Sequence, residues 1–132
     1  MKINILHLSD LHLKSNYCSN ATYEKQLVSK FLDEQSDLYC IVISGDLTNT
    51  GSENEFKQVK KFINNIKEGL ASEIPYDKIK IYFVPGNHDM NFDDNYIDDN
   101  SRYENNEYYS FQNEALEENK FKNFQKFSKI HN

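Results

Sequence analysis

Three short runs of apolar residues stand out along the first two-thirds of the chain. They cover residues 3–8 (INILHL), 39–44 (YCIVIS) and 79–84 (IKIYFV), and each is rich in residues that favour strands. Within each run the apolar residues follow one another with little alternation. Such continuity is typical of strands that are buried on both faces of a parallel sheet. The pattern therefore predicts three parallel strands.

Helical patterns separate these runs. Residues 22–35 carry apolar side chains at helical spacing (Tyr23, Leu27, Val28, Phe31 and Leu32). Ser52 and Glu55 match a capping box and predict the start of a second helix, which we expect to end at Gly69. Its apolar stripe is formed by Phe56, Val59, Phe62, Ile63 and Ile66. Strand, helix, strand, helix, strand is the order of a right-handed parallel α/β unit, which we assign to residues 1–90.

The pattern changes after Asp89. Residues 91–113 are rich in acids and are expected to form an acidic loop, because their spacing lacks the glycine of a calcium-binding loop. Residues 114–130 predict an amphipathic helix with an apolar packing face (Leu116, Phe121, Phe124, Phe127 and Ile130). Together the three parts make one domain over residues 1–132.

Composition narrows the classes of partner. A net charge of −6 and a pI near 5.2 disfavour nucleic acid as a partner. No apolar run approaches the length of a membrane span, so no membrane partner is expected. Cys18 and Cys40 follow neither a metal-binding spacing nor a disulfide framework. We therefore expect a reduced, cytoplasmic protein.

Polar residues with the chemistry of metal ligands follow each predicted strand directly. The first strand leads into Asp10 and His12, the second into Asp46, and the third into Asn87, His88 and Asp89. Ligands of open parallel sheets bind beyond the carboxyl ends of the strands, so these side chains are expected to converge. Mixed oxygen and imidazole ligands suit Mn, Fe or Zn better than Ca or Mg.

Residue types suggest a role for each of these side chains. Asp46 can bridge two cations, and the neutral oxygen of Asn87 limits the negative charge that an anionic phosphate would meet. His88 is a candidate proton donor to the leaving oxygen, and Asp89 is expected to hold an imidazole in one tautomer. His7 lies within the first strand, and we expect it in the core or behind the ligands rather than on a metal.

Three segments resemble the calcineurin-like metallophosphoesterase family, namely SDLHL, SGDLTNTGSENEF and VPGNHD. The second segment looks most like the bacterial branch of cyclic-nucleotide phosphodiesterases and related phosphohydrolases. The resemblance covers residues 3–92. It implies the N-terminal half of a four-layer αββα sandwich and a substrate such as a nucleotide or cyclic nucleotide.

The resemblance also implies a role for each site residue. Asp10 and His12 would bind a first metal, Asp46 would bridge, and Asn87 would bind a second metal. His88 would contact the phosphate as the catalytic acid, with Asp89 beside it, and a hydroxide between the metals would be the nucleophile. The complete enzyme would therefore use two divalent metal ions, with Mn, Fe or Zn favoured.

The chain departs from the family pattern in its C-terminal part. No glycine follows Gly86, so the Gly-His-x-His turn of the family is missing, and we do not expect the one later histidine, His131, to be a ligand. We interpret the chain as an N-terminal fragment of a phosphodiesterase that binds one metal ion or none. Such a fragment would leave one sheet face uncovered and could self-associate through it. The alternatives are a non-catalytic scaffold domain with a vestigial site and a subunit of a metal-dependent nuclease.

Overall fold

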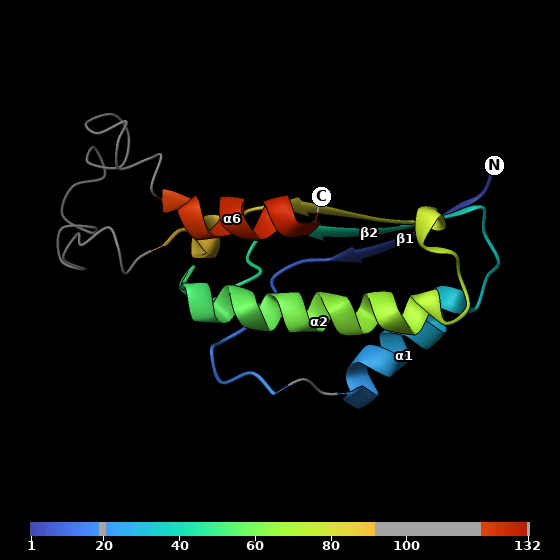
Figure 1. The fold of residues 1–132 in the computed structure, drawn as a ribbon, viewed down its shortest axis with the longest axis horizontal. Coiled ribbons are helices and arrows are strands. Elements are labelled where there is room, and N and C mark those ends of the chain that lie inside the picture. Colours follow the sequence, from blue (N-terminus) through green and yellow to red (C-terminus); the bar gives the residue numbers. More distant parts are fainter. Residues whose placement is uncertain (19–20, 92–119, 132) are drawn as a thin grey trace.

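The computed structural model describes residues 1–18, 21–91 and 120–131 (Figure 1). Three strands are separated by two helices, and a further helix lies near the C-terminus. The predicted acidic loop, apart from Asn91, and the first part of the predicted C-terminal helix lie outside the described residues. Among the described helices, none combines the length and the apolar composition that a membrane span requires.

The three predicted strands form one parallel sheet in the order β1–β2–β3. β1 comprises Ile3–Leu8, β2 Leu38–Ser44 and β3 Ile79–Val84. Ile5 pairs with Cys40, which in turn pairs with Lys80. The strands therefore start and end almost in line, and their carboxyl ends share one edge of the sheet. The predicted α/β unit is confirmed.

Helix α1 (Ala21–Leu32) connects β1 to β2, and α2 (Glu53–Ala71) connects β2 to β3 by way of the short 3-10 helix η1 (Tyr76–Lys78). The Ser52 side chain caps α2 by accepting a hydrogen bond from the Glu55 amide, as predicted. The Glu55 carboxylate reaches back further than a capping box requires and accepts hydrogen bonds from Thr50.

The prediction that α2 ends at Gly69 is wrong, because the helix continues to Ala71. Gly69 lies where α1 packs on α2, and a Cβ atom at this position would come within 3.0 Å of the Val28 side chain. The glycine therefore allows close packing of two helices, and Ser72 caps the helix after it.

Helix α6 (Lys122–His131) packs on the same side of the sheet as α2. The Phe127 ring lies 5.4 Å from that of Phe56 and 5.1 Å from that of Phe83, measured between ring centroids. Phe124 is also buried there. The amphipathic helix thus extends the cover of the helix-facing side of the sheet.

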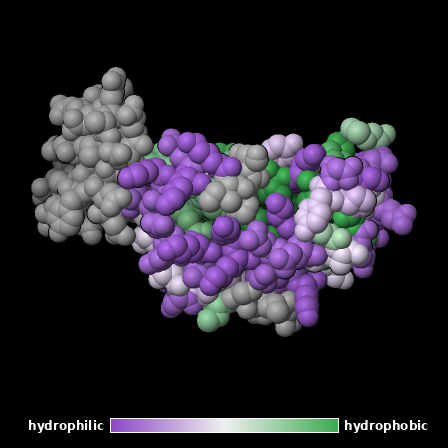
Figure 2. Space-filling model, in the orientation of Figure 1, coloured by the Kyte–Doolittle hydropathy of each residue, from purple (hydrophilic) through white to green (hydrophobic). Residues whose placement is uncertain are grey.

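The two faces of the sheet differ in their environment. The helix-facing residues enclose the core, where Ile41 and Ile43 are fully buried together with Val59, Ile63, Ile66 and Leu70 of α2. On the opposite face Ile5, Tyr82 and Val84 are 61%, 54% and 55% exposed. Among the described residues the sheet therefore has one covered face and one open face. The burial on both faces that continuous apolar runs suggest is not found, whereas the uncovered face that we expected is present. In Figure 2 the surfaces of α2 and α6 are mostly hydrophilic, and hydrophobic residues show between them, over the strands.

Candidate metal centre

The loops that follow β1 and β2 run side by side and are joined by backbone hydrogen bonds. The Asp10 amide donates to the Gly45 carbonyl (3.2 Å), the His12 amide to the Asp46 carbonyl (2.9 Å), and the Leu13 amide to the Leu47 carbonyl (3.0 Å). These bonds extend the pairing of the sheet past its edge. The side chains of Asp10, His12 and Asp46 are thus placed by a continuous ladder.

Three of these residues have a left-handed backbone. Asp10, His12 and Asp46 have φ values of 55°, 45° and 52°, and they are the non-glycine residues with positive φ in the described part of the chain. This conformation is unfavourable for residues with a Cβ atom and tends to occur where function requires it. Each predicted ligand from β1 and β2 is therefore held at some cost in stability.

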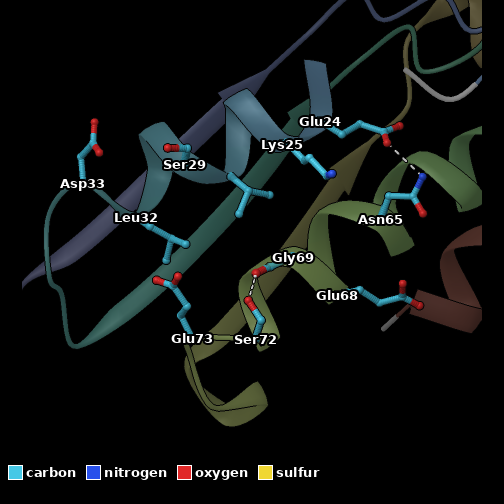
Figure 3. A pocket seen from close by; sticks show the side chains of 11 residues that line it. Glu24, Lys25, Ser29, Leu32, Asp33, Asn65, Glu68, Gly69, Ser72 and Glu73 are labelled. Atoms are coloured by element: carbon cyan, nitrogen blue, oxygen red, sulfur yellow. Dashed lines mark hydrogen bonds between the residues drawn. The ribbon is translucent and has the colours of Figure 1, made fainter. Parts of the chain in front are cut away.

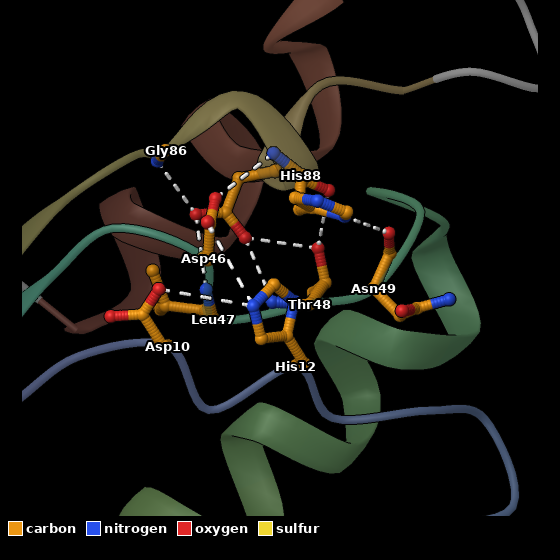
Figure 4. A network of polar contacts seen from close by, with 9 residues as sticks. Asp10, His12, Asp46, Leu47, Thr48, Asn49, Gly86 and His88 are labelled. Atoms are coloured by element: carbon orange, nitrogen blue, oxygen red, sulfur yellow. Dashed lines mark hydrogen bonds and ion pairs between the residues drawn. The ribbon is translucent and has the colours of Figure 1, made fainter.

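His12, Asp46 and His88 come together at this edge (Figure 4). One ligand atom from each of the three lies within 4.8 Å of the others. His12 Nε2 is 3.9 Å from both Asp46 Oδ2 and Asp10 Oδ1. Two imidazole nitrogens and carboxylate oxygens are the donor set of a transition metal, whose bonds to them are about 2.0–2.2 Å long. The residues present therefore fit a cation with only a small contraction of the cluster.

His88 lies on the 3-10 helix η2 (Asn87–Asp89) and is oriented by two groups of the loop after β2. Its Nδ1 lies 2.8 Å from the Asn49 carbonyl oxygen, and its own amide donates to Asp46 Oδ1 (3.0 Å). A carbonyl oxygen only accepts hydrogen bonds, so Nδ1 must carry the proton. Nε2 is then the nitrogen left for a ligand, and the ring meets that of His12 edge to face at 4.6 Å.

The other two predicted residues of η2 are placed differently. Asn87 is exposed at the start of the turn. Asp89 is fully buried, and its carboxylate accepts hydrogen bonds from the Leu47, Thr48 and Gly86 amides and from the Thr48 hydroxyl. We expected Asp89 to hold an imidazole, but in the described residues these four donors occupy its two oxygens.

Two glycines permit the close approach of the second and third loops. Gly45 has a φ of +85°, which favours glycine. Gly86 has an ordinary φ, but a Cβ atom there would lie 2.1 Å from Asp46 Oδ1. Gly86 therefore makes room for the carboxylate that was predicted to bridge two cations.

A separate hollow lies between α1 and α2 (Figure 3). It has a volume of about 730 Å³ and is bordered by one lysine, Lys25, and by four carboxylates (Glu24, Asp33, Glu68 and Glu73). None of the predicted ligands lines this groove. An excess of negative charge opposes the binding of a phosphate. The strand edge, rather than this groove, is therefore the candidate site.

Some contributors to the site were not identified from the sequence. Thr48 is buried beside Asp89, and Asn49 acts through its backbone carbonyl, for which side-chain type gives no signal. His7 was expected in the core or behind the ligands, yet it is exposed on the open face, where its Nε2 lies 2.6 Å from Ser44 Oγ. The side chain of His131 lies outside the described residues.

Comparison with known proteins agrees with this geometry. A family model described as calcineurin-like phosphoesterase matches residues 3–131. The chain is also 30% identical over 95 residues to the uncharacterized metallophosphoesterase-like protein YydB of Bacillus subtilis (strain 168). That match covers 70% of this chain and 19% of YydB, so the chain spans about a fifth of the length of this relative.

Proposed function

Because the chain belongs to the calcineurin-like phosphoesterase family, we propose that it supplies the N-terminal part of a metal-dependent hydrolase of phosphate esters. We further propose that phosphodiesters with a small phosphorylated group, such as a cyclic nucleotide, are its substrates. The observation that carries the proposal is the convergence of His12, Asp46 and His88 at the carboxyl edge of a parallel sheet.

Each residue of the site has a distinct task in this proposal. Asp10, His12 and Asp46 would hold the first cation, and Asp46 with Asn87 would contribute to a second. Divalent cations supply such a site with Lewis acidity toward a phosphoryl oxygen and toward water. His88, protonated on both nitrogens, donates the Nε2 proton to the leaving oxygen while Nδ1 stays bonded to the Asn49 carbonyl.

We predict that the chain binds one transition-metal ion more tightly than a second. We assign Asp10, His12 and Asp46 to the first position, where an oxygen of each carboxylate lies 3.9 Å from His12 Nε2, and only Asp46 and Asn87 to the second. Affinity depends on the number of ligands, so the second position should be weak. Metal analysis after equilibration with Mn²⁺ or Zn²⁺ should give about one ion per chain or fewer. Two tightly held ions would contradict this expectation.

Hydrolysis of bis(4-nitrophenyl) phosphate in the presence of Mn²⁺ tests the activity itself. We expect very weak turnover by residues 1–132 and clear turnover by the longer protein that we propose contains them. The loss of one electrostatic stabiliser typically costs about 10²–10³ in rate. Asp46→Asn should abolish the activity, and His7→Asn, an exposed histidine outside the site, should leave it unchanged.

The same assay separates the enzyme from a scaffold domain that merely keeps the site. A longer protein that binds Mn²⁺ yet hydrolyses neither a phosphodiester nor 4-nitrophenyl phosphate would support the scaffold. Robust turnover by residues 1–132 alone, abolished by Asp46→Asn, would show that the described ligands suffice.

A further inference from the structure

The Asp89 carboxylate lies between the two loops that carry the candidate ligands. Its Oδ1 accepts from the Thr48 amide (2.8 Å) and the Thr48 hydroxyl (2.9 Å). Its Oδ2 accepts from the Leu47 amide (3.1 Å) and the Gly86 amide (2.9 Å). Leu47 and Thr48 directly follow Asp46, and Gly86 directly precedes Asn87. One side chain thus joins the loop after β2 to the loop after β3.

We infer that Asp89 is a positioning residue that fixes the distance between Asp46 and the ligand-bearing turn of Asn87 and His88. The inference rests on the proposed metal-dependent function and adds to it a residue that touches neither metal nor substrate. Asp89 has no solvent exposure, so its side chain has little freedom to take another position. Asp46 then meets the turn at a defined place, where its Oδ1 accepts the His88 amide (3.0 Å).

The side chain of residue 89 must accept hydrogen bonds with both of its terminal atoms. The Leu47, Thr48 and Gly86 partners are backbone N–H groups, and an ionised carboxylate is an acceptor on both oxygens. In Asp89→Asn, the amide NH₂ would face at least one backbone N–H in either orientation. A buried donor that lacks an acceptor is unfavourable. The loops should relieve this conflict by moving apart, which displaces Asp46 from His88.

The Thr48 hydroxyl also joins the loop after β2 to the turn that follows β3. It lies 3.0 Å from the His88 carbonyl and 2.9 Å from Asp89 Oδ1, and it accepts a hydrogen bond from the Gly51 amide (3.0 Å). Its single proton serves the carbonyl or the carboxylate, and both acceptors lie on η2. Thr48→Val keeps the shape of the side chain and removes these bonds, so it offers a milder variant than Asp89→Asn.

Titration with Co²⁺, followed by its visible absorption, tests the inference. Loss of a group that orients metal ligands typically lowers metal affinity by about 10–100-fold. We expect Asp89→Asn to lower Co²⁺ affinity within this range and to change the absorption spectrum of the bound ion. Ile66→Val, in the fully buried core of α2, should reduce the stability of the fold and leave both the Co²⁺ affinity and the spectrum as in the wild type.

The outcomes separate the inference from the proposed function. A wild-type chain that binds no Co²⁺ would overturn both. A wild-type chain that binds Co²⁺, with an Asp89→Asn chain of equal affinity and spectrum, would overturn the inference alone. Should Asp89→Asn fail to fold, Thr48→Val decides: a weaker affinity with a changed spectrum supports the inference, and unchanged binding contradicts it.

Discussion

His88 is held on two sides, through its Nδ1 at the Asn49 backbone carbonyl and through its own amide, which donates to the Asp46 carboxylate. A histidine with a fixed Nδ1 proton can use Nε2 alone for chemistry. If Nε2 protonates the leaving oxygen, the rate should depend on His88 more strongly when that oxygen is more basic. The identity of the leaving group therefore tests the role of the residue.

We predict that His88→Asn slows hydrolysis of an alkyl phosphate ester by about 10²–10⁴, the usual contribution of a general acid. The rate of hydrolysis of a nitrophenyl ester should fall much less in this variant, because nitrophenolate departs without a proton. The measurement is kcat/KM for both esters with the longer protein that we propose contains residues 1–132. Equal losses in kcat/KM for the two esters would show that His88 binds the substrate rather than protonates the leaving group. His7→Asn is the matched control.

Positive φ at Asp10 leads to a prediction on stability. Asp10→Gly should raise the free energy of unfolding of the metal-free chain by up to about 1 kcal/mol, because glycine adopts this conformation without strain. The Asp10 side chain is 68% exposed, so little packing is lost. Metal affinity should fall in the same variant. Asp10→Ala, which removes the carboxylate but keeps the strain, should weaken metal binding without raising stability in urea unfolding.

At the scale of elements, the contact between α1 and α2 limits what residue 69 can be. Alanine in place of a helical glycine ordinarily stabilises a helix by about 1 kcal/mol. Here the added Cβ atom would lie 3.0 Å from the Val28 side chain. We predict that Gly69→Ala gives little or no stabilisation in the wild type, and about 1 kcal/mol in a Val28→Ala background. Urea unfolding of the four chains measures this coupling, and equal effects of Gly69→Ala in both backgrounds would refute it.

The strands, and the convergence of the polar residues that follow them, could be predicted because both follow from patterns along the chain. The apolar runs specify buried strands, and the residues after them must lie at one edge of a parallel sheet. The function of Gly69 could not be predicted, because a glycine near a helix end fits a stop as well as a helix contact. The bonds of Asp89 could not be predicted either, since a carboxylate suits an imidazole and a backbone amide equally.

The side on which α6 packs also required the structure. Phe124 and Phe127 predict an apolar helix face, and this pattern is compatible with either face of the sheet. The choice depends on Phe56 and Phe83, which meet Phe127 on the helix-covered side. Such contacts between distant segments leave no trace in the local pattern.

For the whole molecule, we propose that the open sheet face makes residues 1–132 self-associate weakly. Ile3, Ile5, Tyr82 and Val84 are exposed on it, and a second copy of the chain offers an equally apolar surface. Three strands about 4.8 Å apart and about 20 Å long present on the order of 300 Å². Two such faces would bury roughly 600 Å², which is below the about 1,200 Å² of stable interfaces.

We therefore predict a concentration-dependent shift from monomer to dimer, measured by light scattering after size exclusion. Tyr82→Glu should abolish the shift, because it places a charge on the open face. Tyr76→Glu is the matched control, since Tyr76 lies in η1 and is 62% exposed. A monomer at all concentrations that binds no hydrophobic dye would contradict the prediction.

The order of the strands in the sheet has a consequence for the time at which the site forms. Asp10, His12 and Asp46 leave the ribosome early, whereas His88 follows the last strand, so synthesis of most of the described core must precede assembly of the site. Ligands so far apart in the sequence do not meet in an unfolded chain. The complete site, including Asn87 and His88, therefore forms only after β3 has paired with β2. Bound metal should slow the unfolding rate and leave the folding rate nearly unchanged.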